Sequence, residues 1–217
     1  MSIATPDYRH LKDFPDVYEP AEDTFLLLDA LEKEQNALNK LRPTLTLEVG
    51  SGSGIVTTFL AKILQSKALH LVTDRNSQAT LCTQQTANYN ETRVDAINTD
   101  LVHGLLPRLQ NCVDILILNP PYVVTPSHEL LETGIAWTWA GGICGREVMD
   151  RLFPDVPKLL SKRGIFYLVV VQENKPKEIM KMFENMEFAS TVVLNRRAGP
   201  ENLSVIKFWK KGTEDGS

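Results

Sequence analysis

The stretch LEVGSGSG at residues 47–54 sets the interpretation of the whole chain. An apolar run ends there, glycine recurs at every second position, and a run of helical character follows. A dinucleotide-binding fingerprint would need glycine at position 55 or 57, and a phosphate loop would need lysine after the last glycine; the chain has neither. A plain strand-to-helix turn could carry the same letters. The acid Glu48, two residues before Gly50, instead favours a bound ligand without phosphates.

Short apolar runs rich in β-branched residues alternate with segments of helical period on both sides of this stretch. Strands are predicted at Leu45–Val49, Leu69–Thr73, Val94–Thr99, Val113–Leu118 and Ile165–Gln172, and helices at Ala21–Leu38, Ile55–Gln65, Ser77–Asn88 and Glu147–Leu160. After a further helix at Lys175–Met186, two strands at Ala189–Asn195 and Ser204–Trp209 flank a turn-like segment, 196–202. The pattern predicts an α/β fold with a Rossmann-like, seven-stranded, mostly parallel sheet closed by an antiparallel C-terminal hairpin.

The bulk composition indicates one globular domain. The chain has 217 residues, is 43% hydrophobic and 23% charged, and has a net charge of -4. We expect an N-terminal extension with a helix (1–43), a Rossmann-like core (44–212) and a flexible tail (213–217). An acidic chain without a basic patch is a poor candidate for gripping the phosphates of a nucleic acid. No apolar run reaches the length of a membrane span, and the cysteines and histidines lack metal-ligand spacing. These features predict a cytoplasmic and possibly also nuclear protein without a metal.

Acids close three successive predicted strands. Glu48 lies at the end of the first, Asp74 ends the second, 20 residues after Gly54, and Asp100 follows the third. Ligands of parallel α/β sheets bind at the carboxyl ends of the strands, where an acid accepts hydrogen bonds from ribose hydroxyls. We therefore expect Asp74 to hold a ribose and Asp100 to accept from an adenine amino group.

The fourth predicted strand runs into Asn119-Pro120-Pro121-Tyr122. Prolines can simply end a strand and a tyrosine can simply pack, but two prolines also fix the backbone direction. The side-chain oxygen of Asn119 and the carbonyl of Pro120 are both acceptors and could grip the two hydrogens of an NH2 group. Tyr122 offers a ring on which a planar group can stack. This motif predicts a site for a planar NH2 group and leaves a glutamine amide and an adenine amine equally possible.

Taken with the segments around them, these motifs resemble one family. Glu48, Gly50, Gly52, Gly54, Asp74 and Asp100 resemble the class I methyltransferases that bind S-adenosylmethionine. The resemblance implies that Glu48 and the glycines face the methionine part, and that the Leu101 backbone reads the adenine with Asp100. With 18–25, Asn119–Tyr122, 139–142, 145–151 and 203–208 added, nearly the whole chain resembles the eukaryotic branch of the HemK-type glutamine methyltransferases. That branch implies cofactor contacts by Thr24 and Asn119, and glutamine contacts by Asn119, Pro120, Pro121 and Tyr122.

The same resemblance implies partners. The substrate would be the glutamine of the Gly-Gly-Gln motif of the class 1 translation termination factor. Only 47 residues precede Glu48, so the helical docking domain of bacterial relatives is not expected; the eukaryotic enzymes work instead with a small zinc-binding activator subunit. That subunit would pair with the strand edge near Arg93–Asn98. Arg75 departs from the apolar residue expected after Asp74, which puts the cofactor contacts there in doubt.

Three alternatives stay open from the residues alone. The same motif serves N6-adenine methyltransferases of DNA or RNA, although the acidic charge disfavours them. Methylation of lysine or of a small molecule is a second possibility, and a non-catalytic subunit with a retained fold is a third. The long segment 123–146, with Trp137 and Trp139, is equally readable as a lid or as packed structure.

Overall fold

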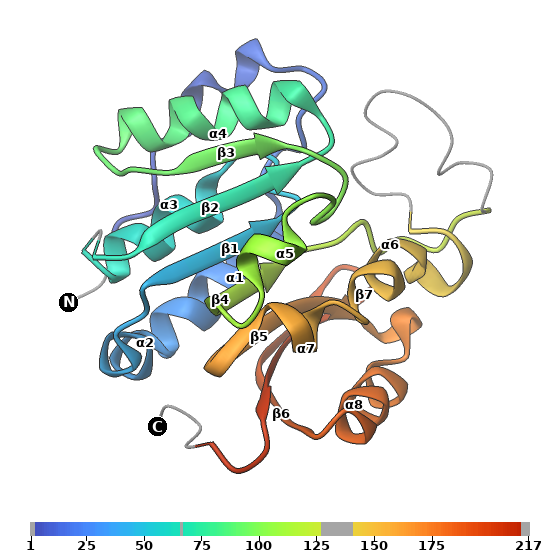
Figure 1. Cartoon of the computed structure of the whole chain (residues 1–217). Helices are drawn as coiled ribbons and strands as arrows, with labels where there is room; N and C mark the ends of the chain where they lie inside the picture. The colour runs from blue at the N-terminus through green and yellow to red at the C-terminus, as the bar shows by residue number, and fades with distance from the viewer. Residues whose placement is uncertain (1–2, 66, 127–140, 214–217) are drawn as a thin grey trace.

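A seven-stranded sheet forms the centre of the molecule in the computed structural model, which describes residues 3–65, 67–126 and 141–213. Its order is β3-β2-β1-β4-β5-β7-β6 (Figure 1). The strands are β1 (Leu45–Val49), β2 (Leu69–Asp74), β3 (Asp95–Asn98), β4 (Val113–Leu118), β5 (Leu160–Val171), β6 (Phe188–Ala198) and β7 (Glu201–Lys210). Strands β1 to β5 pair in parallel, and β7 is antiparallel to both of its neighbours. The predicted fold class, including the antiparallel hairpin, is confirmed.

Helices cover both faces of the sheet (Figure 1). One face carries α1 (Glu22–Lys33), α2 (Gln35–Leu41), α3 (Ile55–Ile63) and α4 (Ser77–Tyr89), with the short helix η1 (Arg9–Asp13) packed on α4. The other carries α5 (Leu106–Leu109), α6 (Glu147–Leu152), α7 (Val156–Leu159) and α8 (Pro176–Asn185). Two short 3-10 turns, η4 (Ile143–Gly145) and η5 (Gln172–Asn174), precede α6 and α8. Within the described ranges, no helix combines the length and apolar character needed to cross a membrane.

Successive side chains of β5 and β7 point to opposite faces of the sheet, and this alternation explains how the helices on each face are attached to it. Phe166 of β5 and Phe208 of β7 are register partners, and Phe183 of α8 packs on them, with its ring centroid 4.4 Å from that of Phe208. The next pair, Tyr167 and Lys207, faces the opposite layer, where Glu34 at the α1–α2 junction accepts hydrogen bonds from both at 3.2 and 2.6 Å. An aromatic core therefore fixes α8, and a largely buried ion pair fixes the end of α1.

Prolines and a tight turn account for the main differences from the predicted elements. The predicted helix Glu147–Leu160 is two short helices, since Pro154 and Pro157 lack the backbone N–H that a continuous helix needs. Strand β5 begins five residues earlier than Ile165, at Leu160. The turn predicted over 196–202 is shorter than expected: β6 and β7 stay paired up to Ala198 and Glu201, which leaves a two-residue turn. All of the predicted tail except residue 213 lies outside the described residues, and the domain division stays a prediction.

Candidate active site

A cavity of about 780 Å³ opens at the carboxyl ends of β1, β2 and β4. This is the crevice in which open α/β sheets bind their ligands. Its lining includes almost all of the residues singled out from the sequence: Thr24, Glu48, Gly50, Gly52, Asp74, Asp100, Leu101, Asn119, Pro120, Pro121 and Tyr122. The fold thus brings the glycine loop, the acids and the Asn-Pro-Pro-Tyr motif into one site.

The glycine loop curls around the end of β2. The amides of Gly50 and Ser51 both donate to the Thr73 carbonyl, at 2.7 and 3.1 Å. Gly50 and Gly52 have φ of 77° and 50°, and a Cβ on either would project into open space on the cavity side. Gly54 is placed differently from the prediction: it does not line the cavity, and a Cβ there would come within 2.6 Å of the Thr83 Cα. Gly54 therefore sets the close packing of α3 on α4.

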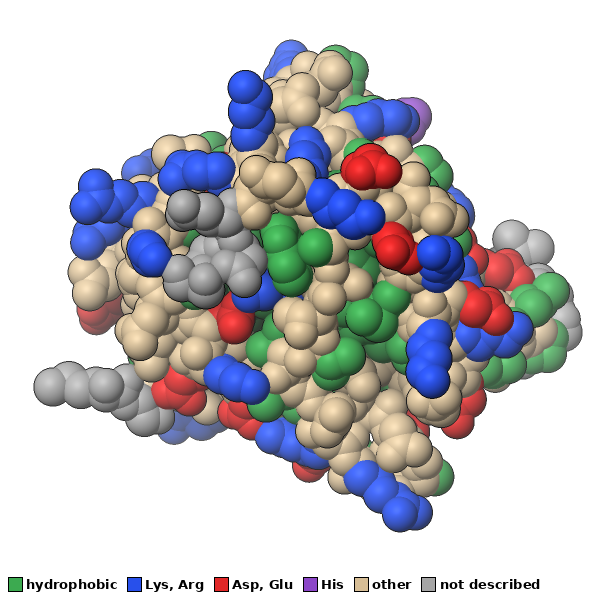
Figure 2. All heavy atoms as spheres, turned by 90° about the horizontal axis from the view of Figure 1, so that it is seen from below, with side chains coloured by type: hydrophobic (Ala, Val, Ile, Leu, Met, Phe, Trp, Pro, Cys, Tyr) green, Lys and Arg blue, Asp and Glu red, His purple; other side chains and the backbone are tan. Residues whose placement is uncertain are grey.

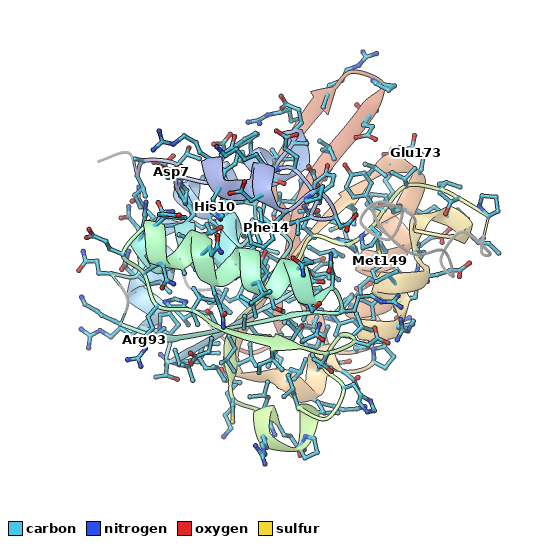
Figure 3. The ribbon with its side chains drawn as sticks, turned by 90° about the horizontal axis from the view of Figure 1, so that it is seen from above. Asp7, His10, Phe14, Arg93, Met149 and Glu173 are labelled. Atoms are coloured by element: carbon cyan, nitrogen blue, oxygen red, sulfur yellow. The ribbon has the colours of Figure 1, made fainter. Side chains whose placement is uncertain are left out.

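The N-terminal segment supports this loop from behind. His10 and Phe14, labelled in Figure 3, lie between η1 and α4. The His10 Nε2 lies 3.0 Å from the Thr86 hydroxyl, which in turn donates to the Ser53 carbonyl at 2.5 Å. Side chains from two remote segments therefore fix a carbonyl of the glycine loop. Sequence reasoning missed this link because nothing in the spacing of residues 10 and 86 relates them.

Glu48 is 2% exposed and bonds to α3. One carboxylate oxygen accepts from the Thr57 amide at 3.1 Å and from the Thr57 hydroxyl. Burial raises the pKa of the Glu48 carboxyl to about 8, although the two Thr57 hydrogen bonds act in the opposite direction. The site therefore holds a carboxyl group whose charge depends on what binds beside it.

This shift predicts a pH dependence of the folded state. Between the ordinary pKa of 4.5 and about 8, folded protein retains a proton that unfolded protein has released. The contribution of Glu48 to stability is therefore complete below the lower value and is lost as pH rises through the upper one. As pH rises through this window, the free energy of unfolding of the parent should fall relative to that of Glu48→Gln. Urea denaturation of both proteins at a series of pH values measures this difference. The exposed Glu173→Gln is the control, and a constant difference for Glu48→Gln would contradict the assignment.

Two further acids have the positions expected of cofactor ligands. Asp74 accepts from the Gly52 amide at 3.0 Å and the Asn76 amide at 2.8 Å, and burial raises the pKa of its carboxyl. Asp100 forms an ion pair with Arg151 of α6, a partner that the sequence did not suggest. Leu101 follows with φ of 50°, which turns its backbone at the cavity wall. Asp74 thus stabilises the glycine loop as well as facing the cavity.

The amide of Asn119 is oriented by Asp23. Asn119 Nδ2 donates to Asp23 Oδ2 at 2.8 Å, while the other oxygen of Asp23 accepts from the Tyr18 hydroxyl at 3.2 Å. A carboxylate only accepts, so it fixes which end of the Asn119 amide faces it. Asn119 Oδ1 is buried and has no hydrogen-bond partner in the described structure. The orphaned acceptor is what an incoming N–H would satisfy.

Asp23 was missed as a site residue. Its place in the first turn of a predicted helix suggested only a favourable interaction with the helix dipole, and Asn119 is 96 positions away. Its side chain is nevertheless 3% exposed and lines the cavity. The available signal was its place next to Thr24, which the family resemblance assigns to the cofactor site.

Tyr122 is nearly buried at 8% exposure, and its hydroxyl lies 3.4 Å from Glu201 Oε2 at the start of β7. Burial, together with the negative charges of Asp23 and Glu201, raises the pKa of the Tyr122 phenol. Burial and Asp23 also raise the pKa of the Tyr18 phenol. Both phenols are therefore neutral in the physiological range, where they act as donors and packing surfaces, not as bases.

Asn174 ties the end of the Asn-Pro-Pro-Tyr motif to the sheet. This fully buried side chain donates to the Tyr122 carbonyl at 2.9 Å and to the Cys144 and Gly145 carbonyls at 3.0 and 3.3 Å. Its oxygen accepts from the Val171 amide at 2.8 Å. A Cβ on Gly145 would lie 1.9 Å from the Tyr122 carbonyl oxygen, so glycine is required at that contact. Sequence reasoning missed Asn174, which has no motif around it.

Removing this tie should weaken both fold and catalysis. Asn174→Ala would take the side-chain donor from the Tyr122 and Gly145 carbonyls and the side-chain acceptor from the Val171 amide. These three contacts are buried, and each unsatisfied group costs about 1–3 kcal/mol. We expect the free energy of unfolding to fall by about 3 kcal/mol or more and kcat to fall with it, measured by urea denaturation and by methyl transfer. Asn195→Ala on the exposed side of β6 is the matched control. A loss of stability no greater than the control's would show that the tie is unimportant.

One predicted feature, the long segment 123–146, is described only at its two ends. Trp137 and Trp139 lie outside the described residues, so the lid and packing interpretations of 123–146 both stay open. At the near end of that segment, Val123 and Thr125 pair with Gly141 and Gly142 through backbone hydrogen bonds of 2.8 and 3.1 Å. The described residues hold no cluster of His, Cys, Asp and Glu able to bind a metal.

Comparison with known proteins places this site in a family. Residues 21–136 match the family model described as Methyltransferase small domain. Human methyltransferase HEMK2 is 53% identical over 211 residues, covering 96% of this chain and 98% of its own. The fission yeast eRF1 methyltransferase catalytic subunit mtq2 is 40% identical, covering 98% and 97%. In the solved Encephalitozoon cuniculi (E. cuniculi) Mtq2–Trm112 complex, the matching chain is 29% identical, with a TM-score of 0.68 over 90% of this chain and 99% of that one.

Full-length similarity at this level, together with the family model, is sufficient for assignment. The chain therefore belongs to the eukaryotic HemK-type methyltransferase family that contains human HEMK2 and fission yeast mtq2.

Proposed function

We propose that this chain transfers the methyl group of S-adenosylmethionine to the side-chain nitrogen of the glutamine in the Gly-Gly-Gln motif of the class 1 termination factor. The observation that carries the proposal is Asn119 Oδ1, a buried acceptor without a partner beside Pro120 in the cavity wall. The relative from fission yeast is named an eRF1 methyltransferase, and the E. cuniculi complex is described as responsible for methylation of eRF1. Both support a protein substrate.

The cavity suits S-adenosylmethionine. This cofactor carries an ammonium group and a sulfonium, and supplies an electrophilic methyl group when bound. Glu48 lies where a cation would lower its raised pKa and restore its charge. Asp74 lies at the end of the neighbouring strand for ribose hydroxyls, with Asp100 and Leu101 next along the wall for adenine. Cofactor affinity should therefore strengthen as pH rises toward 8, with release of a proton on binding.

The protein residues act by holding the acceptor nitrogen. A glutamine amide is a weak nucleophile because its lone pair is delocalised. Acceptors at Asn119 Oδ1 and the Pro120 carbonyl draw its two hydrogens out of the amide plane, which frees the lone pair from conjugation. They also stabilise the positive charge that develops on nitrogen. Tyr122 provides a face against which the planar amide lies. Positioning nitrogen in line with the methyl group supplies the remaining rate enhancement. As the nitrogen–carbon bond forms, the bond between the methyl group and sulfur breaks and S-adenosylhomocysteine leaves. The methylated nitrogen then loses a proton to water, so no general base is needed.

We further propose a heterodimer with a small zinc-binding activator subunit. The E. cuniculi relative was solved as a complex with Trm112. In this chain β3 is an edge strand of the sheet, as predicted for the segment near Arg93–Asn98. An unpaired strand edge is a ready site for another chain. We propose this edge as the docking position, and a cytoplasmic and possibly also nuclear location for the pair.

A methyl-transfer assay with labelled S-adenosylmethionine tests the function. Three acceptors are offered side by side: the termination factor, its variant with glutamine of Gly-Gly-Gln changed to alanine, and adenine-containing DNA. We expect label only in the first. Label in DNA alone would overturn the proposal, as would equal label in both proteins. The face shown in Figure 2 agrees with the expectation, since its Lys and Arg side chains are spread out and do not form one patch.

A further inference from the structure

The tip of the β6–β7 hairpin forms part of the cavity wall. Residues 197–201, which include the two-residue turn, line the same cavity as Asn119 and Tyr122. Glu201, the first residue of β7, places a carboxylate oxygen 3.4 Å from the Tyr122 hydroxyl. The sequence suggested nothing for this segment beyond a turn. The structure therefore brings a negative charge to the part of the cavity formed by the Asn-Pro-Pro-Tyr motif.

Two ion pairs connect the base of this tip to helix α1. Arg196 of β6 pairs with Asp29 and, at 3.5 Å, with Glu22, both on helix α1. The same helix carries Asp23, which orients Asn119. Helix α1 therefore contacts both the hairpin tip, through Arg196, and the Asn119 amide, through Asp23. These contacts set the position of Glu201 relative to Asn119.

Glu201 retains capacity for further hydrogen bonds. A carboxylate has about four acceptor positions, and its contact with Tyr122 is at the long end of the hydrogen-bond range. The side chain is only partly buried, so its charge is accessible from the cavity. Its negative charge is also felt by Tyr122 and Tyr18, whose phenol pKa values it helps to raise.

We propose that Glu201 is a specificity-determining residue that selects a peptide over a nucleic acid. The inference rests on the proposed function. The grip of Asn119 and Pro120 on an NH2 group does not distinguish glutamine from adenine. Glu201 does so because its carboxylate accepts hydrogen bonds from main-chain N–H groups next to the glutamine, which glycine neighbours leave unshielded. The same charge repels the phosphates that flank an adenine base.

The test uses the full chain with its activator subunit, the termination factor and a single-stranded oligodeoxyadenylate. For Glu201→Gln, which keeps the shape and removes the charge, we expect KM for the termination factor to rise about tenfold, the equivalent of about 1.4 kcal/mol. We expect kcat and the affinity for S-adenosylmethionine to stay near parental values. Inhibition by the oligonucleotide should strengthen several-fold. Glu173→Gln, an exposed glutamate outside the cavity lining and labelled in Figure 3, is the matched control.

A second variant keeps the inference testable if Glu201→Gln is poorly folded. Glu201→Asp keeps the charge on a shorter side chain, so it should preserve exclusion of the oligonucleotide while KM for the protein rises. Arg196→Met should raise KM by releasing the tip, and its effect should not add to that of Glu201→Gln. Unchanged KM and unchanged oligonucleotide inhibition in Glu201→Gln would overturn the inference. So would a fall in kcat at constant KM, which would place Glu201 in the chemical step.

Failure of this inference and failure of the proposed function give different results. If the parental enzyme labels DNA and not the termination factor, the proposed function fails. If the parental enzyme labels the termination factor and the Glu201 variants behave like the Glu173 control, only the role of Glu201 fails.

Discussion

Asn119→Ala should lower kcat by about 10²–10³-fold or more, the usual cost of removing one polar group aimed at charge that develops in a transition state. The reason is that Asn119 Oδ1 is the orphaned acceptor of the site, and alanine offers the substrate amide nothing in its place. Binding of S-adenosylmethionine should persist, because Glu48, Asp74 and the glycine loop are untouched. Single-turnover methyl transfer measures the first effect, and titration calorimetry the second.

The control for Asn119→Ala is Asn195→Ala, an exposed asparagine on β6 away from the cavity. It should leave both quantities unchanged. Retained turnover in Asn119→Ala would remove the basis of the proposed mechanism. Loss of turnover together with loss of cofactor binding would show that Asn119 serves the cofactor more than the substrate.

Asp23→Asn should lower kcat by about 10²-fold, nearly as much as Asn119→Ala, because the Asn119 amide would no longer be held in a single orientation. In the parent, the Asp23 carboxylate can only accept, so it holds Nδ2 and leaves Oδ1 for the substrate. An asparagine at 23 can donate to Oδ1 instead, and the Asn119 amide then turns its NH2 toward the cavity. An NH2 group there faces the NH2 of the substrate and cannot grip it.

A double-mutant cycle separates this role from a general loss of structure. Once Asn119 is alanine, Asp23 has no amide to orient, so Asp23→Asn should cost little further in kcat. Fully additive losses would mean that Asp23 acts by a separate route. Cofactor affinity and the unfolding midpoint of Asp23→Asn, compared with those of the parent, show whether the site remains formed.

Much of the candidate site could be predicted because it is built from local pieces at regular positions. Glu48 and Asp74 lie at the ends of apolar strands and Asp100 follows one, and parallel strands bring their carboxyl ends to one edge. Asn119 was found in the same way, by its place after the fourth strand. Gly54 shows the limit of that reasoning: its letter fits the motif, yet the proximity of Thr83 gives it a packing role.

The residues that were missed act across long separations in sequence. Asp23 meets Asn119, Asn174 meets Tyr122, Arg196 meets α1, and Arg151 meets Asp100. Asp23 and Arg151 lie in segments that carry the family resemblance, but nothing in those segments names their partners. No periodicity or spacing relates such pairs, because their contact depends on how helices pack on the sheet.

The sequence by itself determined the order of strands and helices along the chain and the α/β class. It also determined that the site lies at the carboxyl ends of the strands and that it suits a planar NH2 group. Apolar periodicity and turn chemistry are local properties, and the chirality and twist of parallel strands convert them into one topology. Only the tertiary structure decided which way the Asn119 amide faces and what holds Tyr122. It alone placed the carboxylate of Glu201, from the last strand, beside the Tyr122 hydroxyl. These are matters of a few ångströms between groups far apart in the chain, and the packed core sets them.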